Sequence, residues 1–361
     1  MPLLMANGLR LKKFRGIGFI KQRNEEEKME HVTIPQTKLD VSRVALGTWA
    51  IGGWMWGGTD EQESIRTIHA ALDKGVNVID TAPVYGFGRS EEIVGKALKE
   101  YGRRENVRIA TKAGLNWTAD GQVFRDCTPE RITKEIDESL QRLGVDHIDI
   151  YFVHWPDPTV PIEETAQVMN NLFKQGKIGS IGVSNYSTAQ MDAFRGEAPL
   201  HLCQPPYNIF EREIEQDILP YCKTNNIALM TYGVLCRGLL SGKMRRDREF
   251  KGDDLRKADP KFQQPRYDQY LAAVEELKAL GSKKNKGLLP FAVRWVLDRD
   301  VEIALWGGRN PDQMEPLAEI EGWKVDSEIM QRVEDILDEH VTDPVGPEFM
   351  APPSRNDVSM D

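Results

Sequence analysis

The fold that this sequence predicts is a closed eight-stranded (β/α)8 barrel, and three observations lead to it. Eight short apolar runs recur between residues 44 and 306. Segments with helical spacing of their apolar residues separate them, which is typical of a parallel α/β protein. Eight such units within about 300 residues favour a closed barrel.

A doubly wound open sheet is the alternative. If it bound a dinucleotide, it would be expected to carry the pattern GxGxxG after its first strand. Gly86-Phe87-Gly88 begins such a pattern, but Glu91 stands where the third glycine belongs. The barrel therefore remains the preferred fold.

The predicted elements follow in order. Residues 31–46 are expected to form an N-terminal hairpin. Helix boundaries are indicated by Thr128 with Pro129 at one start and by Gly75 and Gly144 at two ends. Barrel strands are expected at residues 44–49, 76–79, 107–111, 148–153, 178–183, 200–204, 227–232 and 303–306. Helices are expected at 61–74, 90–100, 129–143, 161–176, near 189, and at 214–224, 267–280, 288–298, 313–319 and 327–340.

Three regions are expected along the chain. Residues 1–30 are interpreted as a disordered N-terminal extension, because Met29 lies just before the first strand-like sequence. They lack the continuous apolar core of a secretory signal, and a transit peptide or a surface-binding amphipathic segment is the alternative. Residues 31–345 form the barrel with extra C-terminal helices, and a polar insert at 243–265 interrupts it. Residues 346–361 form a Pro-rich tail, expected either to fold over the active-site face or to be a flexible end.

The composition excludes several classes of partner. The net charge of -9 argues against general nucleic-acid or anionic-membrane binding. No apolar run reaches the length of a membrane span. The four cysteines form no CxxC pair, which predicts reduced thiols in a cytoplasmic protein and neither disulfides nor a metal site. The sequence carries no signal for an oligomeric state.

Polar residues close the apolar runs. In a (β/α)8 barrel, the carboxyl ends of the strands carry the active site. One polar strand end means little, but the placement recurs after nearly every run. The residues concerned are Asp80, Lys112, His154, Ser184, Asn185, Gln204, Tyr232 and Gly307-Gly308-Arg309.

Four of these side chains suggest acid–base chemistry. Lys112 is expected to lie beside Asp80, and the plain interpretation is a buried structural ion pair. The functional interpretation adds Tyr85, because a nearby cation lowers the pKa of a phenol and makes it a usable general acid and base. His154 would then hydrogen-bond a substrate oxygen.

At this point the motifs resemble those of the aldo-keto reductase superfamily, in the bacterial general-stress and glyceraldehyde-reductase branch related to potassium-channel β subunits. The match runs in order from about residue 39 to 340. The motifs are Asp80-Thr81-Ala82-Pro83-Val84-Tyr85-Gly86, Ser90-Glu91-Glu92, Ala110-Thr111-Lys112, His154-Trp155-Pro156-Asp157, residues 177–185 and residues 238–243.

The resemblance implies NADP(H) bound in extended form and a catalytic tetrad of Asp80, Tyr85, Lys112 and His154. Tyr85 would protonate the carbonyl oxygen as hydride leaves the nicotinamide, and His154 would orient the carbonyl. Candidate cofactor residues carried over from the family are Thr48, Trp49, Asp80, Ser184, Asn185, Gln204, Tyr232, Gly233, Val234, Leu235, Cys236, Arg237, Lys243, Gly307, Arg309 and Gln313.

The adenosine segment departs from the family pattern. Trp306 replaces a proline, Asn310 replaces a residue that is often basic, and Pro316-Leu317 replace a Glu-Asn pair. Arg309 alone remains to pair with a 2′-phosphate. NADP(H) is therefore the preferred cofactor, with NAD(H) as the alternative.

The predicted activity is reversible reduction of an aldehyde or ketone to an alcohol, and the partner is a small carbonyl or alcohol. Substrate contacts are expected from Trp54, Trp56, Tyr85, His154 and Trp155, with Phe87, Trp117 and Tyr207 as further candidates by position. Two other functions stay open: a cofactor-sensing partner protein with weak reductase activity, and a lyase using Lys112 as an imine-forming residue.

Overall fold

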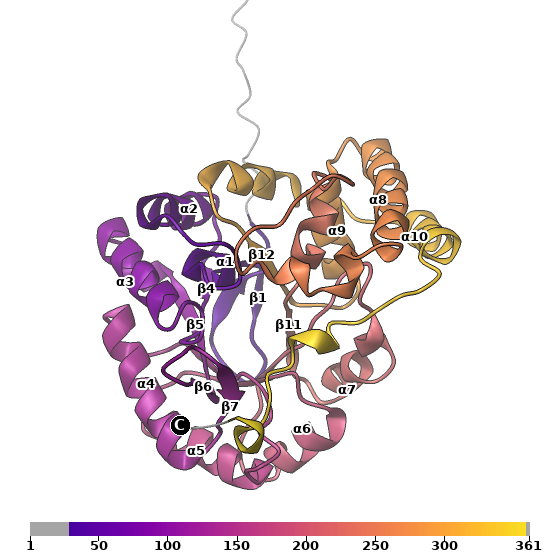
Figure 1. Cartoon of the computed structure of the whole chain (residues 1–361). Helices are drawn as coiled ribbons and strands as arrows, with labels where there is room; N and C mark the ends of the chain where they lie inside the picture. Colours follow the sequence, from indigo (N-terminus) through magenta and orange to yellow (C-terminus); the bar gives the residue numbers. More distant parts are fainter. Residues whose placement is uncertain (1–28, 359–361) are drawn as a thin grey trace, which may run out of the picture.

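Eight parallel strands close into a barrel ringed by helices in the computed structural model, which describes residues 29–358 (Figure 1). This confirms the predicted fold. The barrel order is β10-β11-β12-β3-β4-β5-β8-β9. The strands are β3 (Val44–Gly47), β4 (Val78–Asp80), β5 (Arg108–Ala113), β8 (Ile150–Val153), β9 (Ile181–Ser184), β10 (Leu202–Gln204), β11 (Ala228–Thr231) and β12 (Ile303–Gly307).

An antiparallel hairpin covers the amino-terminal end of the barrel. It consists of β1 (His31–Thr33) and β2 (Asp40–Ser42). Ile34 and Val41 are fully buried and pack with the apolar residues that fill the barrel interior. Residues 1–28 of the expected extension lie outside the described residues, whereas Met29 is buried in the core and Glu30 pairs with Arg43.

Ten α-helices are described. They are α1 (Trp49–Gly52), α2 (Glu61–Asp73), α3 (Arg89–Tyr101), α4 (Pro129–Leu143), α5 (Ile162–Lys174), α6 (Thr188–Arg195), α7 (Ile218–Thr224), α8 (Arg266–Lys283), α9 (Leu288–Leu297) and α10 (Ser327–His340). The helix expected at 313–319 is a 3-10 stretch, Pro311–Glu319, because Pro316 lies inside it without an N–H to donate. Within residues 29–358, no helix is long and apolar enough to cross a membrane.

Strand alternation places the functional side chains. Successive side chains of a strand point to opposite faces, so every second residue faces the barrel axis. Val78, Ala110 and Phe152 fill the barrel interior. The next inward position toward the carboxyl end is therefore two residues later. In β4, in β5 and just after β8, that position holds Asp80, Lys112 and His154.

Three segments without a predicted structure surround the mouth of the barrel. A hairpin of β6 (Leu115–Trp117) and β7 (Val123–Arg125) follows β5. The polar insert contains two short 3-10 turns, Leu255–Lys257 and Pro260–Phe262. After α10, residues 341–358 cross this face of the barrel, drawn in yellow in Figure 1, and end beside β7.

Candidate active site

Asp80 and Lys112 form a buried ion pair below the mouth of the barrel. Lys112 Nζ lies 2.6 Å from Asp80 Oδ1 and donates a second hydrogen bond to the backbone oxygen of Thr81 at 3.0 Å. The other oxygen of Asp80 accepts a hydrogen bond of 2.9 Å from Gln204 Nε2. Burial lowers the pKa of Lys112, while the Asp80 carboxylate acts in the opposite direction and favours the charged ammonium.

Tyr85 lies over this pair at the edge of the cavity. Its ring centroid is 5.1 Å from Lys112 Nζ, and its ring meets the His154 ring edge-on at 5.8 Å. The structure therefore brings the four predicted catalytic residues together. They come from four places far apart in the sequence: β4, the turn after it, β5 and the end of β8.

The pKa of Tyr85 differs from the expectation. The sequence predicts a phenol pKa lowered by Lys112, but burial and the Asp80 carboxylate raise the pKa of Tyr85 well above its ordinary value of 10.0. The reason is that desolvation and the nearby Asp80 charge both disfavour the phenolate. Tyr85 is thus a neutral phenol at physiological pH and available as a proton donor.

His154 is also neutral. Burial and the charge of Lys112 lower its pKa well below the ordinary value of 6.5. Its backbone oxygen accepts a hydrogen bond of 3.0 Å from Asn185 Nδ2, which fixes the chain after β8 against the chain after β9. A neutral imidazole can share a hydrogen bond with a substrate oxygen without adding a charge.

A cluster of amide and hydroxyl groups faces the cavity from β9 to β11. Tyr232 donates to Asn185 Oδ1 at 2.8 Å, Asn185 Nδ2 lies 3.1 Å from Ser184 Oγ, and Ser184 donates to the Gln204 backbone oxygen at 2.7 Å. All four side chains line the cavity. Paired amide donors and acceptors beside an aromatic face suit a planar carboxamide-bearing ring, so these residues fit a nicotinamide.

Thr48 and Trp49 directly follow β3. The Thr48 hydroxyl donates to the backbone oxygen of Asp80 at 2.9 Å, so it fixes β3 to β4. Trp49 lines the cavity, stacks on Tyr85 with the ring centroids 6.0 Å apart, and has a buried Nε1 without a partner among the described residues. The donor that remains available here is therefore the Trp49 indole rather than the Thr48 hydroxyl.

The loop after β11 is formed by Gly233, Val234, Leu235, Cys236 and Arg237. Gly233, Cys236 and Arg237 have left-handed φ values of 69°, 45° and 52°. The guanidinium of Arg237 points into the protein, where it pairs with Glu211 and lies 2.5 Å from Asp259. Backbone groups of this loop, not the Arg237 side chain, are thus left to meet a pyrophosphate.

The loop after β12 carries Gly307, Arg309 and Gln313. Gln313 Oε1 accepts the Arg309 backbone N–H at 2.7 Å. The Arg309 guanidinium donates to the backbone oxygens of Trp56 at 2.9 Å and Gly58 at 2.8 Å. Binding a 2′-phosphate would therefore require Arg309 to exchange these two loop carbonyls for phosphate oxygens. Lys243 lies exposed at the end of the β11 loop.

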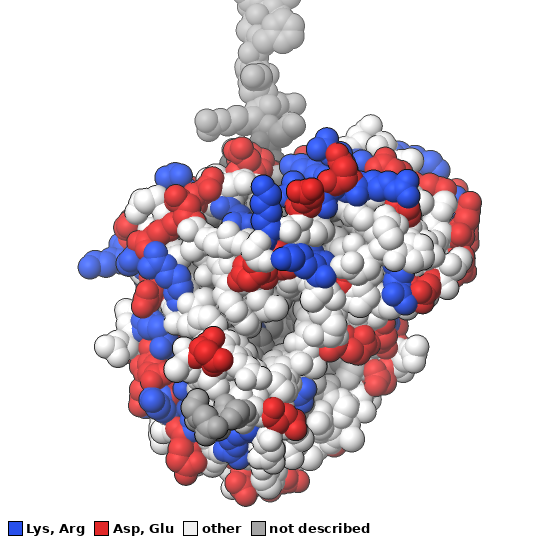
Figure 2. All heavy atoms as spheres, in the orientation of Figure 1, with Lys and Arg blue, Asp and Glu red and all other residues white. Residues whose placement is uncertain are grey.

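A cavity of about 310 Å³ lies between this cluster and the three surrounding segments. Figure 2 shows the corresponding hollow, bordered mostly by uncharged residues. Of the predicted substrate residues, Trp54, Tyr85, His154 and Trp155 line the cavity. Sequence reasoning missed Met55, Val84, Leu115, Val123, Leu255, Ala258, Phe349, Met350 and Pro352.

The other aromatic candidates lie elsewhere. Trp56 is not among the described lining residues and packs edge-on against Trp49 at 5.7 Å. Phe87 is exposed and contacts Trp54 and Trp117 from outside the cavity. Tyr207 is fully buried and donates to Glu215 at 2.5 Å. Position in the sequence therefore did not show whether each of these rings faces the cavity.

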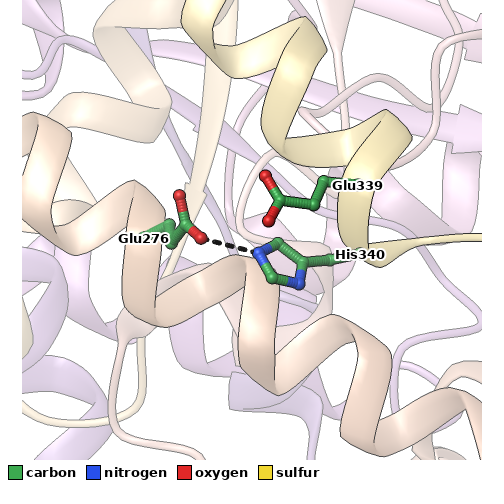
Figure 3. Close-up of side chains that lie close together, drawn as sticks. All are labelled: Glu276, Glu339 and His340. Carbon is green, nitrogen blue, oxygen red and sulfur yellow. Dashed lines mark hydrogen bonds and ion pairs between the residues drawn. The ribbon is translucent and has the colours of Figure 1, made fainter.

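A group of possible metal ligands lies between α8 and α10, outside this cavity. Figure 3 shows Glu276, Glu339 and His340, whose ligand atoms lie within 4.8 Å of one another. Glu276 already lies 2.7 Å from His340 Nε2 and accepts a hydrogen bond of 2.6 Å from Arg332. Because Arg332 offsets the carboxylate charge, we interpret the group as an ion-pair cluster joining the two helices.

The chain is similar to several known proteins. Residues 43–338 match the model of the Aldo/keto reductase family. Aldo-keto reductase YhdN of Bacillus subtilis is 57% identical over 332 residues, which cover 91% of this chain and 100% of that protein. NADH-specific methylglyoxal reductase of Escherichia coli is 37% identical over 301 residues, 79% of this chain and 91% of that protein.

A solved structure shares the fold. The glycerol dehydrogenase AKR11B4 from Gluconobacter oxydans superimposes with a TM-score of 0.81 and 52% sequence identity, and the match covers 91% of this chain and 100% of that one.

Proposed function

The chain belongs to the aldo/keto reductase family and is an oxidoreductase that reduces carbonyl groups, and we propose that its substrates are short, uncharged aldehydes and ketones reduced with NADP(H). The observation that carries this proposal is the lining of the cavity. Among the described residues that line it, none is Asp, Glu, Lys or Arg. A charged substituent on the substrate would lose its hydration there without gaining a counter-charge.

The relatives are consistent with this class. Two similar proteins are named for methylglyoxal and for glycerol, which are small and uncharged. The cavity of about 310 Å³ must also hold the nicotinamide, so the space left between its tryptophan, leucine and valine walls suits a short substrate with an apolar or hydroxylated body.

A bound nicotinamide supplies the hydride, and this chain's residues supply the position and the proton. Tyr85 begins as a neutral phenol and donates its proton to the carbonyl oxygen. Lys112, 5.1 Å from the ring centroid, then stabilises the phenolate that remains. Asp80 holds Lys112 in place through the 2.6 Å ion pair. In the reverse direction the same phenolate accepts the proton of the alcohol.

His154 orients the carbonyl in this proposal. Because its pKa is lowered, it offers one neutral N–H and adds no second positive charge beside Lys112. Proton donation by Tyr85 and alignment by His154 are therefore separate roles.

Two observations bear on the cofactor. Arg309 is the basic side chain at the end of β12 and supports NADP(H), because a guanidinium pairs well with a 2′-phosphate. The similar reductase from Escherichia coli is NADH-specific by name. We favour NADP(H) and keep NAD(H) as the alternative. The four cysteines are buried and free, which supports our proposal of a reducing, cytoplasmic compartment.

The test compares matched neutral and charged substrates. Oxidation of NADPH and of NADH is followed with glyceraldehyde and with glyceraldehyde 3-phosphate. We expect kcat/KM for the neutral aldehyde to exceed that for the phosphate ester by about a hundredfold or more, because the cavity offers the phosphate no counter-charge. Equal kcat/KM values for the two aldehydes would contradict the proposal.

The two alternative functions are less consistent with these observations. The cofactor-sensing role finds no support in the relatives, which are named as reductases or dehydrogenases. A lyase needs Lys112 to reach the substrate. Lys112 is fully buried, paired with Asp80, and not among the described residues that line the cavity.

A further inference from the structure

The carboxy-terminal segment forms the outer wall of the substrate cavity. Phe349, Met350 and Pro352 line the cavity. The segment has little structure of its own here, only the 3-10 turns Glu348–Met350 and Arg355–Asp357. Its position therefore depends on side chains elsewhere that hold it.

One group of contacts holds the beginning of the carboxy-terminal segment. Lys261 Nζ donates to the Gly346 backbone oxygen at 3.0 Å, and the Val345 N–H donates to the Tyr270 hydroxyl at 3.3 Å. The Arg237 guanidinium lies 5.7 Å from the Phe349 ring centroid. These contacts fix where the segment enters the active-site face but leave the stretch from 350 to 353 unsupported.

Arg125 of β7 supports that stretch. Its Nε donates to the Pro352 backbone oxygen at 2.8 Å, and its backbone N–H donates to the Pro353 oxygen at 3.0 Å. Pro352 and Pro353 have no N–H, so only their carbonyl oxygens can be bonded. The Pro353 bond uses the Arg125 backbone and remains in any variant, so the side chain of Arg125 is the partner of Pro352.

The same guanidinium also holds the neighbouring wall segment, which follows β8. Arg125 Nη1 donates to the Pro156 backbone oxygen at 3.2 Å, and the guanidinium lies 5.3 Å from the ring centroid of Trp155, which lines the cavity. Arg125 itself is not among the described lining residues. It thus connects two walls of the cavity without contacting what the cavity holds.

We propose that Arg125 is a positioning residue that sets the width of the substrate cavity by tying the carboxy-terminal segment to the wall after β8. This inference rests on the proposed function for its kinetic consequence only. With Arg125 in place, the cavity is narrow and retains short substrates. Without it, the tail wall moves outward, short substrates lose contacts, and bulkier carbonyls are admitted. Cofactor contacts on β9 to β12 are not involved.

The test uses two variants. Arg125→Gln removes the forked guanidinium, and Arg125→Lys keeps the charge but cannot reach the Pro352 and Pro156 carbonyls together. The matched control is Arg355→Gln. Arg355 lies on the same segment, but its longer contacts to Thr159 at 3.3 Å and Asp126 at 3.6 Å lie beyond the cavity. Melting temperatures establish that each variant is folded, and Arg125→Lys serves if Arg125→Gln does not fold.

The first readout needs no substrate. Chymotrypsin cleavage after Phe349 is expected to be about tenfold faster in both Arg125 variants and near the wild-type rate in Arg355→Gln, because loss of a charge-assisted hydrogen bond worth about 1.4 kcal/mol raises the open population tenfold. An unchanged cleavage rate in both Arg125 variants would contradict the claim that Arg125 holds the carboxy-terminal segment in place.

The second readout separates KM from kcat. For a short aldehyde, KM is expected to rise about tenfold in the Arg125 variants with kcat within about twofold. KM for a bulky aldehyde such as phenylacetaldehyde should not rise, and the cofactor Kd from tryptophan fluorescence should stay the same. Faster cleavage with an unchanged ratio of the two KM values would show that Arg125 holds the tail without setting specificity, and would overturn the proposal. If the wild-type protein reduces no aldehyde, the proposed function fails, and the cleavage readout still decides whether Arg125 holds the tail.

Discussion

Replacing Lys112 by methionine isolates the role of its charge in proton transfer. Methionine keeps much of the length of the side chain and removes the ammonium, which lies 5.1 Å from the Tyr85 ring centroid. If the ring distance stands in for the separation of the two charges, a unit charge stabilises the Tyr85 phenolate by about 3 kcal/mol at an effective dielectric constant of about 20. Since 1.36 kcal/mol is tenfold in rate, Lys112→Met should lower kcat by about a hundredfold.

Stability must be separated from chemistry in this experiment. Lys112→Met leaves the Asp80 carboxylate buried with the Gln204 amide, and breaking a buried ion pair costs about 3–5 kcal/mol. The double variant Asp80→Asn/Lys112→Met removes the orphaned charge, so it should unfold at higher denaturant than the single variant while kcat stays low.

The assay is single-turnover oxidation of the reduced cofactor at saturating aldehyde, with denaturant unfolding measured on the same samples. A kcat for Lys112→Met within about threefold of wild type would refute the electrostatic argument. Recovery of kcat in the double variant would also refute it, because the loss would then reflect misfolding rather than the missing cation.

Three further variants test separate parts of the structure. Burial raises the pKa of Glu135 from 4.5 to about 7. The contribution of Glu135 to the free energy of unfolding is therefore fully present below about pH 4.5 and is lost as pH rises through 7. Glu135→Gln should remove on the order of 3 kcal/mol of this pH dependence, measured by denaturant unfolding from pH 4.5 to 8. A Cβ at Gly182 would lie 2.3 Å from the Phe152 ring, whereas one at Gly47 meets nothing closer than 3.9 Å. Gly182→Ala should therefore lower the free energy of unfolding by about 1–3 kcal/mol, and Gly47→Ala by much less. Equal losses of stability in the two variants would contradict this. Arg309→Gln should weaken NADPH binding about tenfold or more and NADH binding little, as measured by fluorescence titration. Equal weakening of both cofactors would show that Arg309 supports the loop through the Trp56 and Gly58 carbonyls and does not bind a 2′-phosphate.

Much of the barrel could be predicted because its signals are local. Apolar runs and helical spacing lie within windows of about 5 to 15 residues, and a strand's period of two fixes which residue faces the axis. Asp80, Lys112 and His154 were found as polar residues that close apolar runs, and the period of two explains why all three face the axis. Tyr85 was added as the phenol that follows Asp80 after a short turn and could act beside Lys112, although nothing local sets the direction of a side chain in a turn.

The rest depends on contacts between distant segments. Asp253 accepts hydrogen bonds from the Met55 and Gly57 N–H groups, which brings the polar insert over the loop after β3. Arg125 holds Pro352 across more than half of the chain. Neither contact has a local signature, so the insert was expected only as a polar stretch, and a tail folded over the active-site face was one of two alternatives. The pKa of Tyr85 was predicted in the wrong direction, because desolvation depends on the assembled site.

The central claim is that Tyr85 donates the proton to the substrate carbonyl, and Tyr85→Phe tests it most directly. Phenylalanine keeps the ring between Trp49 and His154 and removes only the hydroxyl. The variant should bind the reduced cofactor with an unchanged Kd and reduce glyceraldehyde with kcat lower by a factor of about 10² to 10⁴. A variant that binds the cofactor and turns over at the wild-type rate would contradict the claim.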